Sequence, residues 1–291
     1  MVKRACLLIF LFVIFSLKGN PNIKFPTLGG KLFWTDVKVI EGWRVQKNLV
    51  TGHFRLLNPR LIRYAWGNQQ ECLDILEDKT VIRKDKKTVF LIHGLGLRKR
   101  SLKCLKPQLE QAGYQVVMFG YSTFLESIED SADKLDSVMS EYTGDIYVVT
   151  HSMGGILFRQ YQKKYKRDFK ALVMLAAPNQ GTTFVDGLKD AGLDSLAGIN
   201  GRRLHTGCDG LPKILPEPKG PFITIAGIKK NELGYGPQFF SSEESDGLVP
   251  ESATRLSGAE AHYTFKVSHY KIMHKPEVQK LILNFFSSKS F

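Results

Sequence analysis

The chain has 291 residues, of which 43% are hydrophobic, and it carries a formal net charge of +13 at pH 7. This length is sufficient to bury a substantial core, and the composition excludes a disordered or repetitive chain. The basic residues are scattered, with local groups at residues 98–100 and 163–167 and no nucleic-acid-binding motif beside them. We therefore expect a solvated basic surface; attraction to an anionic membrane is the second interpretation, and nucleic acid is not an expected partner.

The N-terminus has the pattern of an export signal. Lys3 and Arg4 precede an uncharged run over residues 5–17 that is rich in Leu, Ile and Phe. A basic start followed by an apolar run is typical of a signal peptide, and this run is short for a membrane span. We expect residues 1–20 to be removed on export to the periplasm or the medium; an uncleaved N-terminal membrane anchor is the alternative.

Residues 21–85 show little periodicity and several turn signals. They contain all three tryptophans of the chain, Trp34, Trp43 and Trp66. We expect this segment to be an N-terminal extension that packs on the main domain.

From residue 86 to residue 291 the pattern becomes regular, with short apolar runs alternating with segments of helical spacing. Strands are predicted over residues 88–92, 114–119, 145–150, 171–176, 222–226 and 263–267. Helices are predicted over residues 101–112, 128–142, 155–165 and 276–286. This alternation predicts an α/β catalytic domain with a doubly wound, mostly parallel sheet, whose chemistry lies at the carboxyl ends of the strands.

Residues 179–221 interrupt this pattern between two predicted strands. The segment is rich in Gly, Pro and polar residues and is too long for a simple connection. Such insertions often form lids over an active site. The segment is therefore interpreted as a lid, with a rigid insertion as the alternative.

The cysteines outside the apolar N-terminal run are Cys72, Cys104 and Cys208. In an exported protein, an odd number allows one disulfide and one free thiol, and the sequence does not choose among the three pairings. No Cys/His cluster has the spacing of metal ligands, so no metal or organic cofactor is expected.

Ser152 lies two residues after the strand predicted over residues 145–150, and Met153, Gly154 and Gly155 follow it. This is the pattern of a nucleophile elbow, in which a strand turns sharply into a helix and exposes a serine at the tip. Thr150 stands where the usual motif has its first glycine, which is a mild departure because Thr is small. Ser152 is the predicted nucleophile; the alternative is a glycine-rich turn with a bystander serine.

A serine nucleophile also needs backbone N–H groups that stabilise the developing oxyanion. After the strand over residues 88–92 come His93, Gly94 and Leu95. The glycine allows the backbone to turn its amides toward the catalytic centre. The N–H groups of Leu95 and Met153 are predicted to form the oxyanion hole, and His93 is expected to brace the loop.

A carboxylate must orient the catalytic histidine. Asp246 lies on a loop that follows the strand over residues 222–226, and its context is Gly-Leu-Val-Pro. Glu243 and Glu244 are close in the sequence. Asp246 is the predicted acid, and the alternative is that all three are solvated loop charges.

The base must follow the last strand on a loop. His269 comes directly after the strand over residues 263–267, whereas His262 precedes that strand and His274 is close to the closing helix. His269 is the predicted base, and His274 is the second choice.

The order Ser152, Asp246, His269 is that of the α/β-hydrolase triad, and the chain resembles the bacterial lipases and esterases of that superfamily. The matching segments are residues 90–96, 150–155, 175–182, 246–250 and His269 followed by residues 276–278. The third segment is similar to an apolar-Pro-x-x-Gly-Ser/Thr segment of bacterial triacylglycerol lipases. The resemblance covers the chain from residue 86 onward and does not extend to residues 21–85.

This resemblance implies a serine hydrolase that cleaves carboxylic esters, most of all those of lipids, through an acyl-enzyme. An acyltransferase or thioesterase with the same catalytic residues is the first alternative. A non-catalytic binding protein with a hydrolase fold and a membrane-surface binding module are the others. Lipid or ester is the expected substrate, with peripheral contact to an anionic membrane; the sequence does not indicate an oligomeric state.

Overall fold

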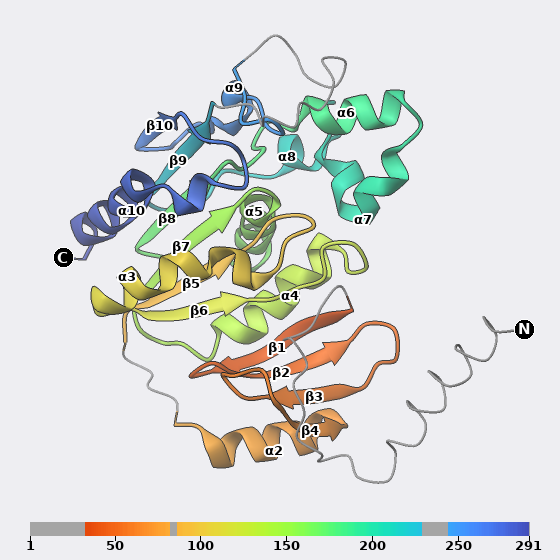
Figure 1. The fold of residues 1–291 in the computed structure, drawn as a ribbon, viewed down its shortest axis with the longest axis vertical. Coiled ribbons are helices and arrows are strands. Elements are labelled where there is room, and N and C mark those ends of the chain that lie inside the picture. Colours follow the sequence, from red (N-terminus) through yellow and green to blue (C-terminus); the bar gives the residue numbers. More distant parts are fainter. Residues whose placement is uncertain (1–32, 82–85, 229–243, 291) are drawn as a thin grey trace, which may run out of the picture.

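The computed structural model describes residues 33–81, 86–228 and 244–290 (Figure 1). Its centre is a sheet of six parallel strands in the order β10-β9-β8-β7-β5-β6. The strands are β5 (Thr88–Ile92), β6 (Gln115–Phe119), β7 (Ile146–His151), β8 (Ala171–Leu175), β9 (Phe222–Gly227) and β10 (Ala261–Phe265). The fold class expected from the alternating pattern is confirmed. The predicted signal peptide, residues 1–20, lies outside the described residues.

Helices cover both faces of this sheet, because successive side chains of a strand point to opposite sides. On one face Phe90 and Ile92 belong to a buried cluster with α4 and α5; on the other, Val89 and Leu91 pack with η2, α3 and α10. The bounds of these helices are α4 (Ile128–Met139), α5 (Met153–Tyr165), η2 (Lys99–Leu105), α3 (Lys106–Gln111) and α10 (Pro276–Ser288). Within the described residues, no helix combines the length and the hydropathy needed to span a bilayer.

The N-terminal extension contains more regular structure than its sequence indicates. A separate antiparallel sheet comprises β1 (Trp34–Ile40), β2 (Trp43–Asn48), β3 (Phe54–Leu57) and β4 (Arg63–Gly67), followed by α2 (Gln69–Lys79). A bulge in β1 between Asp36 and Lys38 breaks the alternation of buried and exposed residues, and β2 buries the polar residues Arg44 and Gln46. These two features interrupt the alternation of apolar and polar residues by which a strand is recognised in a sequence.

This small sheet packs beside β6, the edge strand of the parallel sheet. Asp36 donates its backbone N–H to the carbonyl of Gly120 at 2.8 Å and accepts the N–H of Gly120 on its carboxylate at 2.8 Å. The hydroxyl of Tyr142 donates to the carbonyl of Val39 at 2.7 Å. The extension therefore lies against the edge that the parallel sheet leaves open.

The insertion over residues 179–221 consists of short helices. They are α6 (Thr183–Asp190), η3 (Asp194–Ala197), α7 (Gly198–Gly201), η4 (Arg202–Leu204) and α8 (Leu211–Ile214), and Figure 1 shows them beside α5 and the loops at one end of the sheet. Gly201 approaches Leu95, and Gly198 approaches Phe124, so the insertion lies over the loops that follow β5 and β6.

Two buried polar side chains fix part of this insertion to the main domain. Asn200 donates to the carbonyls of Thr123 and Glu126 and accepts the backbone N–H of Ile128 at 3.0 Å. The guanidinium of Arg159, on α5, donates to four backbone carbonyls, those of Asn179, Pro212, Leu215 and Pro216. Burial lowers the pKa of Arg159 to about 10, which leaves it charged at neutral pH.

We expect Arg159→Met to destabilise the protein because it leaves those four carbonyl oxygens, three of them in buried hydrogen bonds, without a donor. The expected loss of unfolding free energy is about 3 kcal/mol or more, since each unsatisfied buried acceptor costs about 1–3 kcal/mol. Urea denaturation measures this loss. Lys163→Met on the exposed side of the same helix is the matched control, and equal midpoints for the two variants would contradict the anchoring role of Arg159.

The three described cysteines form no disulfide with one another. Cys72 is buried, Cys104 is half-buried and Cys208 is exposed, each as a free thiol. The pairing considered from the sequence is therefore absent among these three residues.

Candidate active site

Ser152 lies at the sharp turn between β7 and α5. Its φ of 53° and ψ of −130° place it in a conformation that non-glycine residues rarely adopt. Its backbone N–H donates to the carbonyl of Leu175 on the neighbouring strand at 2.8 Å, and its own carbonyl accepts the N–H of Gly155. These bonds hold the strained residue in place, as the elbow pattern in the sequence predicts.

Close backbone approaches explain the small residues around Ser152. A Cβ atom at Gly154 would overlap the carbonyl oxygen of Ile92, and one at Gly94 would lie 2.7 Å from Cβ of Ser152. Thr150 is fully buried in the sheet, with its hydroxyl unpaired among the described residues. The loop after β5 therefore packs directly against Ser152, and the Thr that replaces the first motif glycine fits within the sheet.

The backbone N–H groups predicted to form the oxyanion hole lie on these two segments. Met153 is the first residue of α5, where a helix leaves its N–H groups without intrahelical acceptors. Leu95 follows Gly94 on the adjacent loop, and the next N–H, that of Gly96, donates to Oγ1 of Thr123 at 3.2 Å. Within the described chain, no hydrogen bond occupies the N–H of Leu95 or Met153.

His93 braces the loop that carries Leu95. Its ring stacks on Tyr121 with centroids 4.5 Å apart, and the Tyr121 hydroxyl donates to the carbonyl of His93 at 2.7 Å. Nδ1 lies 3.0 Å from the carbonyl of Gly94. Burial, and to a lesser degree the charge of Lys99, lower the pKa of His93 to about 4, so the ring is neutral at physiological pH.

His269 and Asp246 form a buried pair. Nδ1 of His269 donates to Oδ2 of Asp246 at 2.7 Å, and the backbone N–H of His269 donates to the Asp246 carbonyl at 3.0 Å. The other carboxylate oxygen of Asp246 accepts the N–H groups of Leu248 and Val249 at 2.9 and 2.8 Å. With Nδ1 committed to the carboxylate, Nε2 of a neutral His269 is the atom free to accept a proton.

His151 connects this pair to Ser152, its neighbour in the chain. Nε2 of His151 donates to the carbonyl of His269 at 3.0 Å, and the two rings lie 4.7 Å apart. Burial, followed by the charge of His269, lowers the pKa of His151 well below its usual value, so it donates as a neutral ring. His151 was not among the predicted site residues, although its position beside the nucleophile was an available signal.

Other histidines and acids near the C-terminus do not join this arrangement. His274 is exposed on η6 (Ile272–His274). His262 forms hydrogen bonds with Glu251 at 2.8 Å and with the buried hydroxyl of Thr224 at 2.7 Å, rather than with Asp246. Glu244 is exposed, and Glu243 lies outside the described residues. Within the described part, no group of three or more His, Cys, Asp or Glu side chains is placed to hold a metal ion.

Among the described residues, no hydrogen bond joins Oγ of Ser152 to the His269 ring. Catalytic hydrogen bonds are often long without substrate and shorten when it binds. The geometry therefore provides a half-buried, strained serine, a histidine oriented by a carboxylate, and two unoccupied N–H groups.

We expect stability to fall on acidification because His93 must remain neutral when folded. Its pKa is 6.5 as a free side chain and about 4 in the folded state, so the unfolded chain binds more protons between these pH values. Between pH 7 and pH 5 this single group removes about 2 kcal/mol of unfolding free energy. Urea denaturation of His93→Gln should show a smaller pH dependence than the wild type, whereas His274→Gln, at an exposed site, should keep the full dependence.

Comparisons with known proteins agree with this architecture. Residues 83–191 match the family model described as serine aminopeptidase, S33, a range that includes Ser152 and ends before Asp246 and His269. No curated protein matches the chain by sequence.

Solved structures are similar over most of the chain. The mature form of the Bacillus licheniformis lipase BlEst2 has a TM-score of 0.57 and 20% identity, covering 71% of this chain and 95% of that one. Its propeptide form has a TM-score of 0.54 and 20% identity, with 68% and 50% covered. The phospholipase PlaB from Legionella pneumophila has a TM-score of 0.50 and 17% identity, with 70% and 60% covered. The parallel sheet, the serine elbow after β7 and these similarities show that the chain has the α/β-hydrolase fold.

Proposed function

We propose that this protein is a serine hydrolase that cleaves carboxylic esters, with lipids as its principal substrates. The observation that carries the proposal is the buried Asp246–His269 pair, which lies against His151 next to the strained Ser152. A serine at an elbow has a weakly nucleophilic hydroxyl until a neighbouring base takes its proton. A carboxylate-oriented imidazole supplies that base.

In the proposed reaction, Oγ of Ser152 attacks the ester carbonyl while Nε2 of His269 takes its proton. Asp246 accepts the Nδ1–H bond throughout and stabilises the imidazolium that forms. The N–H groups of Leu95 and Met153 stabilise the oxyanion of the tetrahedral intermediate. His269 then protonates the leaving alcohol, and an acyl group remains on Ser152. Water activated by His269 releases the acid and restores the serine.

An exposed apolar surface supports a lipid substrate. Leu193, Leu196 and Ile199 on the insertion are exposed, Leu196 by 67%. Leu125 is also exposed, and it lies close to them, since Gly198 contacts the preceding residue, Phe124. A group of large exposed apolar side chains is unusual on a soluble protein and marks interaction surfaces. The similarity to a lipase and a phospholipase points in the same direction.

The test of this proposal is hydrolysis of p-nitrophenyl esters from acetate to palmitate, alongside emulsified triglyceride. We expect turnover of the esters and release of fatty acid from the emulsion. An acyltransferase would instead transfer the acyl group to an added alcohol faster than to water. Absence of turnover of every ester, in protein shown to be folded, would contradict the proposal.

We expect only part of the insertion to act as a lid. Asn200 and Arg159 fix the segment from α7 to α8. The N-cap of α6, Thr182, donates to the carbonyl of Leu248, but beyond this cap α6 and η3 carry no comparable buried polar anchor in the described structure and present Leu193 and Leu196 to solvent. If α6 and η3 move, the hydrolysis rate should rise sharply once a short-chain ester exceeds its solubility, because the interface stabilises exposed apolar surface.

Leu196→Gln is the diagnostic variant for this lid, because it makes the most exposed apolar side chain of the segment polar. It should reduce the rise at the interface and leave hydrolysis of the dissolved ester unchanged. A smooth saturation curve through the solubility limit in the wild type would instead identify the insertion as a static cap.

A further inference from the structure

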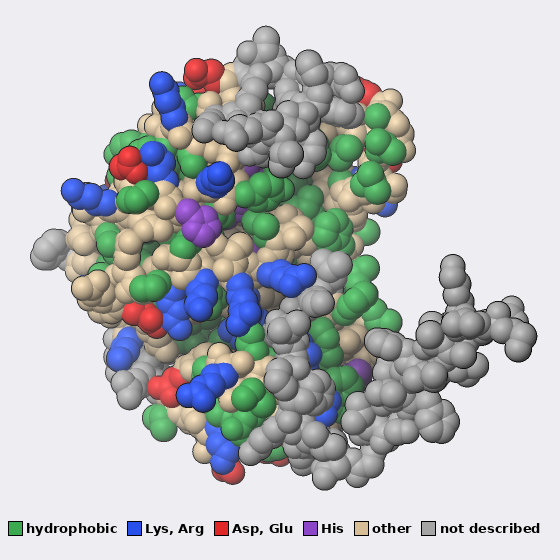
Figure 2. Space-filling view, viewed as in Figure 1, with side chains coloured by type: hydrophobic (Ala, Val, Ile, Leu, Met, Phe, Trp, Pro, Cys, Tyr) green, Lys and Arg blue, Asp and Glu red, His purple; other side chains and the backbone are tan. Residues whose placement is uncertain are grey.

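A cavity lies between the N-terminal sheet and the parallel sheet, and Ser152 does not line it. It has a volume of about 480 Å³ and is lined by β6, by η2 and α3, and by the turn between β1 and β2. Its basic lining residues are Arg44, Lys86, Lys99, Arg100, Lys103 and Lys106, against two acidic ones, Glu41 and Glu110. Figure 2 shows a row of Lys and Arg side chains across the same region of the surface.

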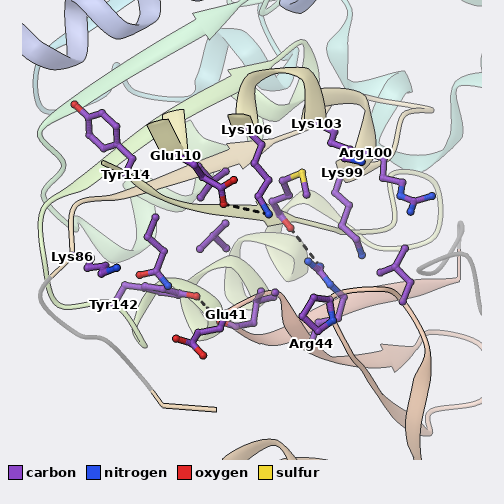
Figure 3. Close-up of a pocket in the computed structure, with 18 of the residues that line it drawn as sticks. Glu41, Arg44, Lys86, Lys99, Arg100, Lys103, Lys106, Glu110, Tyr114 and Tyr142 are labelled. Carbon is purple, nitrogen blue, oxygen red and sulfur yellow. Dashed lines mark hydrogen bonds and ion pairs between the residues drawn. The ribbon is translucent and has the colours of Figure 1, made fainter. Parts of the chain in front are cut away.

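Among the described residues, the acidic groups that line this cavity do not balance the basic ones. Lys106 forms an ion pair with Glu110 at 3.4 Å. The buried carboxylate of Asp36 forms ion pairs with both Arg44 and Lys99. Arg100 and Lys103 have no carboxylate partner within the described residues, and both are exposed at the cavity. Figure 3 shows these two side chains and Lys99 on the η2 wall, with Arg44 on the opposite wall.

One buried donor of a residue that lines the cavity also lacks a partner among the described residues. The side chain of Arg44 is 5% exposed; one terminal nitrogen pairs with Asp36, yet Nε has no acceptor among the described residues. Buried polar groups are nearly always satisfied in native proteins, and a buried N–H donor is satisfied by an acceptor such as water or an anion, so this donor is compatible with an anionic ligand.

The edge of β6 adds polar backbone groups to the same wall. The N–H of Gln115 donates to the carbonyl of Lys87, toward β5, so the next residue, Val116, directs its N–H and carbonyl to the opposite, open edge. Val116 lines the cavity. An anion there would therefore meet a backbone donor as well as guanidinium and ammonium groups.

The positive electrostatic potential of this region affects the pKa of Lys99. Burial, and then the charges of Arg44, Arg55 and Arg100, lower its pKa to about 7, although Asp36 acts in the opposite sense. A bound anion would favour the charged form of Lys99, and the same coupling would strengthen anion binding.

We propose that this cavity is a binding site for a multiply charged, phosphate-bearing anion, held by Arg44, Arg100 and Lys103. Planar guanidinium groups match phosphate oxygens in bidentate geometry, and two or more cations are needed to balance a phosphate monoester or diphosphate. The same chemistry is present in a soluble phosphate compound and in the headgroup of phosphatidic acid. The site shares no residue with Ser152, Asp246 and His269, so it stands independently of the proposed esterase activity.

Calorimetric titration of the folded protein with pyrophosphate, at constant ionic strength, tests the soluble source. Sedimentation with phosphatidylcholine vesicles containing one fifth phosphatidic acid tests the lipid source. The diagnostic variant is Arg100→Gln/Lys103→Gln, whose residues are exposed and should not affect folding. The control is Lys163→Gln/Lys280→Gln, which removes the same charge from exposed positions on α5 and α10.

We expect the diagnostic variant to weaken binding at least about tenfold in one of the two titrations, and the control to change it less than about twofold. The titration that responds identifies the source of the phosphate. Equal losses in the two variants would show that only the net charge matters. That result, or binding of neither probe, would overturn the proposal.

Discussion

Ser152→Ala is expected to reduce kcat for ester hydrolysis by about 10³-fold or more while the protein stays folded. The hydroxyl is the atom that forms the acyl-enzyme, and no neighbouring group replaces it. Removing Oγ does not disturb the backbone bonds of Ser152 to Leu175 and Gly155, which hold the elbow. The measurement is the steady-state rate with p-nitrophenyl butyrate, together with the urea midpoint of each protein.

Ser101→Ala is the matched control for this substitution. Ser101 is half-buried on η2, and its hydroxyl has no partner among the described residues, so its loss should affect neither rate nor stability. If Ser152→Ala retained a rate near that of the wild type, the assignment of the nucleophile would be wrong.

Asp246→Asn is expected to lower kcat by about 10³-fold or more, close to the effect of His269→Ala. Oδ1 of Asp246 accepts two backbone N–H groups, so an asparagine would keep its carbonyl oxygen there and turn its NH₂ toward Nδ1 of His269. The imidazole would then carry its proton on Nε2 and could not accept one from Ser152. Rates for both variants, measured with the same ester, test this expectation.

The second histidine–carboxylate pair provides the control. Glu251→Gln alters the hydrogen bond to His262 in the same chemical sense, and His262 has the buried Thr224 as its other partner. Its kcat should match that of the wild type. A large loss of kcat in Glu251→Gln with little loss in Asp246→Asn would show that Glu251, rather than Asp246, is the working acid.

The parallel sheet could be predicted from the sequence because its strands are buried on both faces and therefore appear as uninterrupted apolar runs. The strand over residues 88–92 has the predicted bounds. The predicted helix over residues 101–112 is only partly right, since it begins as the 3₁₀ helix η2 before α3. The small antiparallel sheet was missed because its pattern is broken by the bulge in β1 and by buried arginine.

Candidate site residues on sharp turns or after strands were predictable, because the chain order alone places them at one end of a parallel sheet. The structure adds what the order cannot give: His269, rather than His274, meets Asp246. His151 and Arg159 were not predicted, since their partners are distant in the sequence. The basic group at residues 98–100 was interpreted as solvated surface, which is wrong for Lys99, a buried residue.

The central claim, that Ser152 is a nucleophile activated by His269, is tested most directly by covalent labelling. The protein is treated with a fluorophosphonate probe and digested, and the modified peptide is sequenced by mass spectrometry. Our account predicts a single adduct on Ser152, which forms far more slowly in His269→Ala and is absent from Ser152→Ala. An unlabelled Ser152 in folded wild-type protein, or an adduct on another serine, would contradict it.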